Sequence, residues 1–336
     1  MSILGTSSVK PAWLAVLLGS LAAAGLLLGA GAGSTGWQAL SQAWSDDAAW
    51  QIVREIRLPR SVGAWLAGAL LGLAGALAQG LFRNPLADPF LLGSASGATL
   101  AVCIWLSLVG AGASMAQSPL GPTGAAFVGA LGAVLLTVAL SRGVQHTLRL
   151  LLAGVIVGVV LGALSNWLSL LQPQVLQAMQ GFMLGSTGLV GWPACALMAA
   201  ALTLCLLLAW PLARVLDALA LGEDTARSLG MPLGWARWLL ITAFALATGA
   251  AVAQVGLVAF VGLAAPHLVR SLSPTGYRWH LSLSALTGAL LLLLADLLAR
   301  VLMAPQDIPV GVLTAVLGGG YLLLRMSRLS SGGVRS

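Results

Sequence analysis

Very few side chains in this sequence could carry chemistry of their own. The 336 residues include three cysteines and three histidines. The cysteines Cys103, Cys195 and Cys205 each lie inside an apolar stretch, and no CxxC or HExxH spacing gathers metal-binding residue types. No GxxxxGK(S/T) phosphate loop occurs either. We therefore expect no metal site, no catalytic site, and no cofactor or nucleotide bound by this chain itself.

Ionisable side chains within apolar runs are the next candidates, because a charge in lipid is costly and usually functional. Asp296 and Arg300 are four residues apart on one helical face, and we interpret them as a self-neutralising pair rather than a proton relay. An ion-coupled transporter needs a carboxylate or a broken-helix ion site near the membrane midplane. None is evident in the sequence. This favours energy supplied by another subunit and leaves an ion-coupled secondary transporter as the alternative class.

The composition sets the environment of these residues. The chain is 59% hydrophobic and 7% charged, whereas a soluble domain carries about 25% charged residues. Most of its surface must therefore contact membrane lipid. The net charge of +7 comes from arginines scattered singly at the ends of apolar runs. This pattern indicates anchoring at the membrane surface and not binding of nucleic acid.

Apolar runs long enough to cross a bilayer divide the chain. Eight are clear, at 12–33, 61–81, 90–109, 123–140, 150–171, 190–211, 281–303 and 309–324. The stretch 239–268 is long for one span and short for two, and Gln254 and Gly256 could divide it. We predict an all-α polytopic membrane protein of about ten transmembrane helices, with residues 1–336 forming a single transmembrane permease domain.

The distribution of basic residues decides the orientation, since cytoplasmic loops are enriched in lysine and arginine. With 239–268 split into two spans, twelve of the sixteen basic residues lie inside. The four outside are Arg54, Arg57, Arg60 and Arg300. A single span there would place eight basic residues on the cytoplasmic side and eight on the outer side. We therefore predict two spans at 239–268 and place both termini in the cytoplasm.

Polar residues gather on each side of the predicted membrane. Several outer arginines on one face suggest a site for an acidic partner. On the inner side, the segment 214–235 alternates short helical stretches with the glycine stops Gly222 and Gly230. Asp217 and the pair Glu223 and Asp224 suit helix N-termini. The segment 214–235 is longer than a simple connection between two helices requires, which indicates that it docks a cytoplasmic partner.

Small residues recur at four-residue spacing in the run 150–171, as Gly154, Gly158 and Gly162. Such a ridge lets helix backbones approach closely in lipid. Tight helix packing is the first interpretation, and the lining of a conduit or of a subunit interface is the second.

Five motifs, in order along the chain, resemble one family. They are Arg57–Arg60 (RLPR), Gln79–Gly93 (QGLFRNPLADPFLLG), Leu150–Gly154 (LLLAG), Gly256–Arg270 (GLVAFVGLAAPHLVR) and Asp307–Gly311 (DIPVG). Together they resemble the permease subunits of type II ABC importers for ferric siderophores, haem and cobalamin. The resemblance spans essentially the whole chain.

The resemblance implies partners and site residues. Such permeases are homodimers with the conduit at the dimer axis. Two cytoplasmic ATPase subunits bind ATP and magnesium, and they also bind the segment 214–235 of the permease. A periplasmic binding protein delivers the substrate. Glutamates of the binding protein would meet Arg57, Arg60 and Arg300. The cytoplasmic gate would include Asn84, Leu86, Thr147 and Leu148, where Leu148 replaces the small polar residue expected in the cobalamin branch.

The sequence thus predicts the non-enzymatic permease subunit of an ATP-driven importer in the bacterial inner membrane. The expected cargo is an iron chelate, with haem ahead of ferric siderophore and cobalamin.

Overall fold

All regular secondary structure in the described parts of the chain is helical. The computed structural model describes residues 9–31, 47–110, 120–141, 144, 147–304 and 306–332, with only the backbone of residues 120, 147 and 322–332. The predicted all-α polytopic class is confirmed. The helices are α1 (Pro11–Gly31), α3 (Asp47–Ile52), the π-helix η1 (Val53–Arg57), α4 (Leu58–Phe82), α5 (Ser94–Val109), α6 (Leu120–Leu140), α7 (Thr147–Leu171), α8 (Pro173–Leu184), α9 (Trp192–Ala209), α10 (Ala213–Ala220), α11 (Glu223–Ser228), α12 (Leu233–Val255), α13 (Val261–Leu272), α14 (Tyr277–Val301) and α15 (Val310–Gly332).

Seven helices among the described residues are long and apolar enough to cross a membrane. They are α1, the continuous helix Asp47–Phe82 that contains α4, and α6, α7, α9, α12 and α14. Two shorter apolar helices, Ser94–Val109 and Val310–Tyr321, occupy further predicted spans. The number of ten crossings and the cytoplasmic termini stay predictions.

The ambiguous stretch 239–268 is divided into two helices. α12 ends at Val255, and Gly256 has a φ of +69°, a conformation that side chains with a Cβ rarely adopt. The second helix, α13, has 12 residues. At 1.5 Å per residue it is about 18 Å long, shorter than the hydrocarbon core of about 30 Å. Residues 256–260 between these helices are irregular and are buried or half-buried by protein, as non-helical backbone inside a membrane must be.

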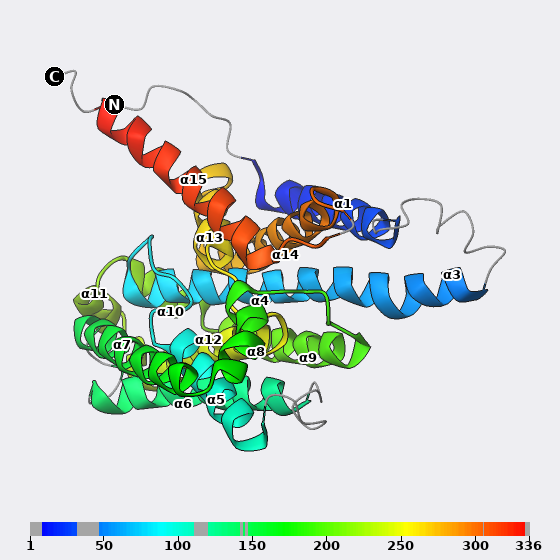
Figure 1. Cartoon of the computed structure of the whole chain (residues 1–336). Helices are drawn as coiled ribbons and strands as arrows, with labels where there is room; N and C mark the ends of the chain where they lie inside the picture. The colour runs from blue at the N-terminus through cyan, green and yellow to red at the C-terminus, as the bar shows by residue number, and fades with distance from the viewer. Residues whose placement is uncertain are drawn as a thin grey trace.

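Helix α4 is the centre of the molecule. In Figure 1 it runs between α1, α13, α14 and α15 on one side and α5–α9 and α12 on the other. Glycines allow this crowding: a methyl group at Gly68 or Gly72 would overlap backbone oxygens of α14, and one at Gly75 would overlap Gly262 of α13. Lipid gives no hydrophobic drive for helix association, so this close backbone contact holds the helices together.

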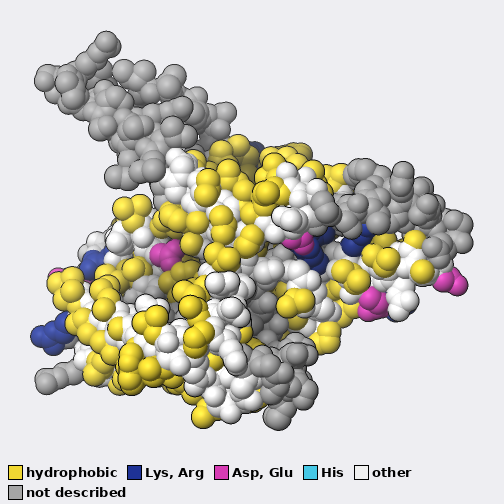
Figure 2. Space-filling model, viewed as in Figure 1, with side chains coloured by type: hydrophobic (Ala, Val, Ile, Leu, Met, Phe, Trp, Pro, Cys, Tyr) yellow, Lys and Arg dark blue, Asp and Glu magenta, His cyan; other side chains and the backbone are white. Residues whose placement is uncertain are grey.

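The outer surface is apolar. Figure 2 shows hydrophobic side chains over most of one face of the molecule, with few charged groups between them. Helix α7 is the clearest case, because large apolar side chains are exposed along its length, among them Leu148, Leu152, Val155, Val159 and Leu170. A surface of this kind is stable against lipid or a second protein surface and not against water.

The glycine contact of α4 can be tested with Gly72→Ala. The added methyl group would overlap the carbonyl oxygen of Ser284, so the two helices must separate. We expect a loss of about 1–3 kcal/mol in unfolding free energy, typical of overpacking. Gly132→Ala is the matched control, because that glycine of α6 has nothing within 4 Å of the added methyl. Equal stability of the two variants in detergent unfolding would contradict the proposed contact.

Candidate functional site

One end of α4 carries a cluster of charges centred on Asp296 of α14, a fully buried residue. Its carboxylate forms an ion pair with Arg300, accepts a hydrogen bond from Arg60 Nε at 3.1 Å, and accepts another from Thr187 Oγ1 at 2.5 Å. A buried carboxylate is stable only when such partners replace its water. The self-neutralising pair predicted for Asp296 and Arg300 is therefore present, with a second arginine added.

The arginines of this cluster also bind neighbouring segments. Arg300 donates to the carbonyl oxygen of Gly29 at 3.3 Å and to Ser61 Oγ at 3.1 Å. Arg57 donates to the carbonyl oxygens of Ala30 at 3.4 Å and Gly31 at 3.2 Å. These oxygens lie at the C-terminal end of α1, where a cation also favours the helix dipole. The Asp296 cluster thereby joins α1, α4, α14 and the segment before α9.

Arg60 is the member of the cluster nearest the surface. Its Nη1 lies 2.5 Å from Asp307 Oδ2, and the Asp307 side chain is 52% exposed. The three predicted docking arginines, Arg57, Arg60 and Arg300, thus lie together, as expected. They are nonetheless turned toward partners within the chain, and Arg57 and Arg300 are buried. Their docking role stays a prediction.

The segment 214–235 contains two short helices, α10 and α11, with Gly222 at φ +120° and Gly230 at φ +71° as the predicted stops. Glu223 begins α11 as expected, and Asp224 follows it at the surface. The expectation for Asp217 was wrong in detail. It lies inside α10, and its Oδ1 accepts the backbone N–H of Tyr277 at 2.9 Å, so it caps the start of α14.

Glu223 is the charged centre of this segment. Its Oε1 lies 3.0 Å from Arg237 of α12 and 3.2 Å from Arg227 of α11. Burial alone would raise the pKa of Glu223, but Arg237, with the charges of Arg227 and Arg83, lowers it below its ordinary value. The ion pair therefore stabilises the folded chain at neutral pH. This contribution is lost only as the pH falls through the lowered pKa.

The predicted gate residues lie on two separate segments. Asn84 follows the left-handed Arg83 at the end of α4, and its Oδ1 accepts the N–H of Leu86 at 2.9 Å. Leu148 stands in the first turn of α7 with 70% of its surface exposed. The side chain of Thr147 lies outside the described residues. The structure therefore leaves Leu86 and Leu148 as exposed apolar groups, and their role as a gate stays a prediction.

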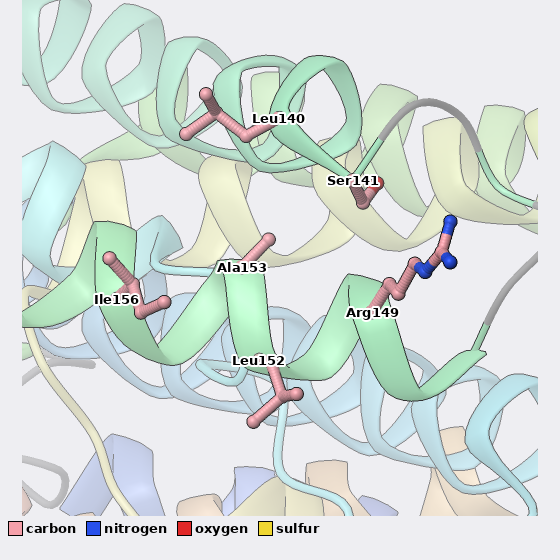
Figure 3. Close-up of a pocket in the computed structure, with 6 residues that line it drawn as sticks. All are labelled: Leu140, Ser141, Arg149, Leu152, Ala153 and Ile156. Carbon is pink, nitrogen blue, oxygen red and sulfur yellow. The ribbon is translucent and has the colours of Figure 1, made fainter.

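A cavity of about 600 Å³ opens beside Leu148, between the end of α6 and the start of α7. Its lining is apolar except for Ser141 and Arg149 (Figure 3). Figure 3 shows the Arg149 side chain reaching from the first turns of α7 toward the end of α6 at Ser141. Sequence reasoning did not single out this cavity, since neither residue belongs to a spacing with a known chemistry.

The three glycines of α7 differ in their surroundings. A methyl group at Gly154 would overlap the carbonyl oxygen of Leu91, in the loop before α5. At Gly158 and Gly162 the nearest side-chain atom would be Ser96 Oγ, at 3.8 Å. The face that carries these glycines thus lies toward the start of α5.

Comparisons with known proteins agree along the whole chain. The FecCD transport family matches residues 11–328. The hemin transport system permease protein of Yersinia pestis is 39% identical over 311 residues, which cover 90% of this chain and 92% of that protein. The vitamin B12 import system permease protein of Salmonella typhimurium is 40% identical over 281 residues, covering 82% and 84%.

A solved structure described as an inward-facing metal-chelate type ABC transporter has the same fold. It superposes with a TM-score of 0.84 at 28% identity and covers 95% of this chain and 100% of that chain. Apolar spanning helices with this arrangement define a multi-pass permease of the ABC importer class. The chain belongs to the FecCD transport family. The resemblance drawn from the sequence motifs is confirmed, and the chain is a transport component.

The Asp296 cluster can be tested with Asp296→Asn. The substitution keeps the side-chain size but leaves Arg300 and Arg60 without their shared buried counter-charge. We expect a loss of about 3–5 kcal/mol in unfolding free energy, as for other broken buried pairs. Asp307→Asn removes the half-exposed partner of Arg60 and should change stability by less than about 1 kcal/mol. Detergent unfolding measures both, and a small effect of Asp296→Asn would show that the cluster does not hold the helices.

Proposed function

We propose that this chain is the permease subunit of a type II ABC importer that carries an iron chelate, haem foremost, across the bacterial inner membrane. One observation carries the proposal. The chain aligns at 39% identity along 92% of a hemin transport permease, and its family match extends from residue 11 to residue 328. The similar identity to a vitamin B12 permease supports a bulky metal chelate as the cargo class. Leu148 is apolar where the family resemblance leads us to expect a small polar residue in the cobalamin branch, and this weighs against cobalamin within that class.

The Asp296 cluster supports an energy source outside this chain. Ion-coupled transporters bind their coupling ion at carboxylates or broken helices within the membrane. Asp296 is the buried carboxylate of α14. It already forms ion pairs with two arginines and accepts a hydrogen bond from Thr187. A coupling proton or sodium ion would have to displace these partners. ATP binding and hydrolysis in two cytoplasmic ATPase subunits, with magnesium bound there, would supply the energy instead.

The proposed assembly assigns a partner to each end of the molecule. Segment 214–235 projects charged groups such as Asp224 and Arg227 and would receive the ATPases. Arg57, Arg60 and Arg300 would meet acidic groups of a periplasmic binding protein. Helix α7 exposes apolar side chains on several sides, which suits contact with lipid on one side and with a second copy of this chain on the other. The conduit would lie at that homodimer axis, closed on the cytoplasmic side by Asn84, Leu86, Thr147 and Leu148.

Uptake into proteoliposomes tests the function. The chain, with its co-expressed ATPase, would be reconstituted with ATP inside and the binding protein outside, and haem, a ferric siderophore and cobalamin would be compared. We expect uptake of haem that requires ATP and the binding protein and continues when ionophores collapse the proton and sodium gradients. A non-hydrolysable ATP analogue is the control. Uptake that follows the gradient and ignores ATP would instead establish the secondary transporter.

The docking proposal is tested with Arg60→Gln, because Arg60 is the least buried of the three predicted docking arginines, with 14% of its side chain exposed. Loss of this charge should slow association with the binding protein several-fold and weaken the dependence of that rate on salt. Arg54→Gln is the matched control, since Arg54 is 66% exposed and pairs only with its neighbour Glu55 at 3.5 Å among the ion pairs of the described residues. Surface plasmon resonance on the reconstituted complex gives both rates. An unchanged rate for Arg60→Gln would remove this residue from the docking site.

A further inference from the structure

Arg237, near the start of α12, is a buried cation that binds two different segments. Its side chain is 4% exposed. Nη1 donates to Glu223 Oε1 at 3.0 Å and to the carbonyl oxygen of Val144 at 3.4 Å. Glu223 belongs to α11, while Val144 belongs to the connection between α6 and α7. One guanidinium therefore holds a surface helix and an interhelical connection in a fixed relation.

The position of these contacts is specific. Val144 is itself buried and packs in the main core, so the connection is anchored at this residue. Four residues further along, Leu148 stands in the first turn of α7. On the other side, the charge of Arg83 acts on Glu223, and Arg83 directly precedes Asn84. The Glu223–Arg237 pair is thus bonded to the segment before Leu148 and lies within electrostatic range of the segment that carries Asn84.

The charged groups around the pair are unequal in role. Glu223 forms ion pairs with Arg237 and Arg227, and the more distant positive charge of Arg83 also acts on it. Arg227 is 59% exposed and binds Glu223 four residues away on the same helix, so it adds no link to another segment. A cavity of about 320 Å³ lined by Arg227, Met231 and Arg237 opens beside the pair. The packing there leaves room for α11 to shift against α12.

The chemistry of arginine suits a link of this kind. A guanidinium presents several N–H donors in a rigid planar fork and can bind a carboxylate and a carbonyl together. Lysine carries the same charge as a single point on a flexible stem and cannot hold both acceptors in a fixed geometry. Arg237→Lys therefore keeps the buried charge balanced while it loosens the link between α11 and the connection at Val144.

We propose that Arg237 is a positioning residue that couples α11 to Val144, four residues before Leu148 of α7, so that movement of α11 reaches that gate residue. This rests on the proposed function, in which segment 214–235 receives the ATPase subunits. Displacement of α11 by the ATPases would move Glu223, and Arg237 would carry the displacement to Val144. Glu223 and Arg237 act as one unit, and the gate residue moves at its far end.

The test compares Arg237→Lys with Arg54→Lys in the assembled transporter, reconstituted in proteoliposomes with its ATPase and binding protein. Three quantities are measured: ATPase retained on the permease, ATP hydrolysed, and chelate taken up. Arg237→Lys should retain the ATPase and hydrolyse ATP, while uptake per ATP falls about tenfold, the size expected for one lost hydrogen bond to a charged group. Arg54→Lys makes the same chemical change at an arginine that is 66% exposed and lies outside segment 214–235, and it should keep the uptake-to-ATP ratio of the unmodified chain.

A direct measurement of the gate accompanies the ratio. A cysteine placed by Leu148→Cys is labelled with a maleimide, with and without ATP, since the three native cysteines are buried. We expect labelling that depends on nucleotide in the Leu148→Cys background and that no longer does so after Arg237→Lys is added. A purely structural role of Arg237 would lower stability but leave this dependence in the folded fraction.

If Arg237→Lys does not assemble with the ATPase, a second variant tests the same proposal. Glu223→Arg combined with Arg237→Glu restores an ion pair, but a carboxylate at 237 cannot donate to the Val144 carbonyl. This double variant should retain the ATPase and still show the lowered ratio of chelate uptake to ATP hydrolysed. Normal ratio and normal nucleotide-dependent labelling in either variant would overturn the proposal. Retention of the ATPase after Asp224→Lys combined with Arg227→Glu, which reverses two exposed charges of segment 214–235, would instead show that this segment is not the docking site, which is failure of the proposed function.

Discussion

Two apolar helix surfaces surrounded by lipid gain little by joining each other, so the helices of this chain must be held by close backbone contact and by polar links. Helix α4 meets that constraint along its whole length. Its glycines admit the backbones of α13 and α14 in the middle of the molecule. At one end, Arg57 binds the end of α1, and Arg60 binds Asp296 of α14, which also pairs with Arg300.

The two charged centres lie near opposite ends of α4. Arg60 belongs to its first turn and Arg83 follows its last, a separation of about 35 Å along the helix. Between them the interior of the described residues is mostly small and apolar, with a few buried polar side chains such as Gln79, Thr248 and Ser284. With so few polar groups there, the two ends are joined mainly by packing. Any influence must pass as movement of packed helices, because close-packed cores shift between discrete arrangements and do not deform gradually.

Features set by local sequence could be predicted. The helical class follows from the apolar runs, the break in 239–268 from Gly256 and the charge balance, and the Asp296–Arg300 pair from four-residue spacing. Contacts between distant segments could not be predicted. Arg60 reaches Asp296 across 236 residues, and Asp217 caps a helix 60 residues away. Helix α8 was missed because its 12 residues form neither a span nor a long periodic pattern. The burial of Arg57 and Arg300 could not be predicted for the same reason, because the sequence does not show which distant carbonyl oxygens an arginine will contact.

The short helix α13 has a consequence for how the chain is made. A segment of 12 residues, entered through irregular backbone, cannot leave the translocon as an independent span. It becomes stable only when Gly262 has settled against Gly75 and the segment is covered by α4 and α14. Helix α14, which follows α13 in the chain, must therefore already be in the bilayer when α13 becomes stable. Biogenesis of this protein would end with a folding step inside the membrane, and ribosomal synthesis order alone does not set the order of insertion.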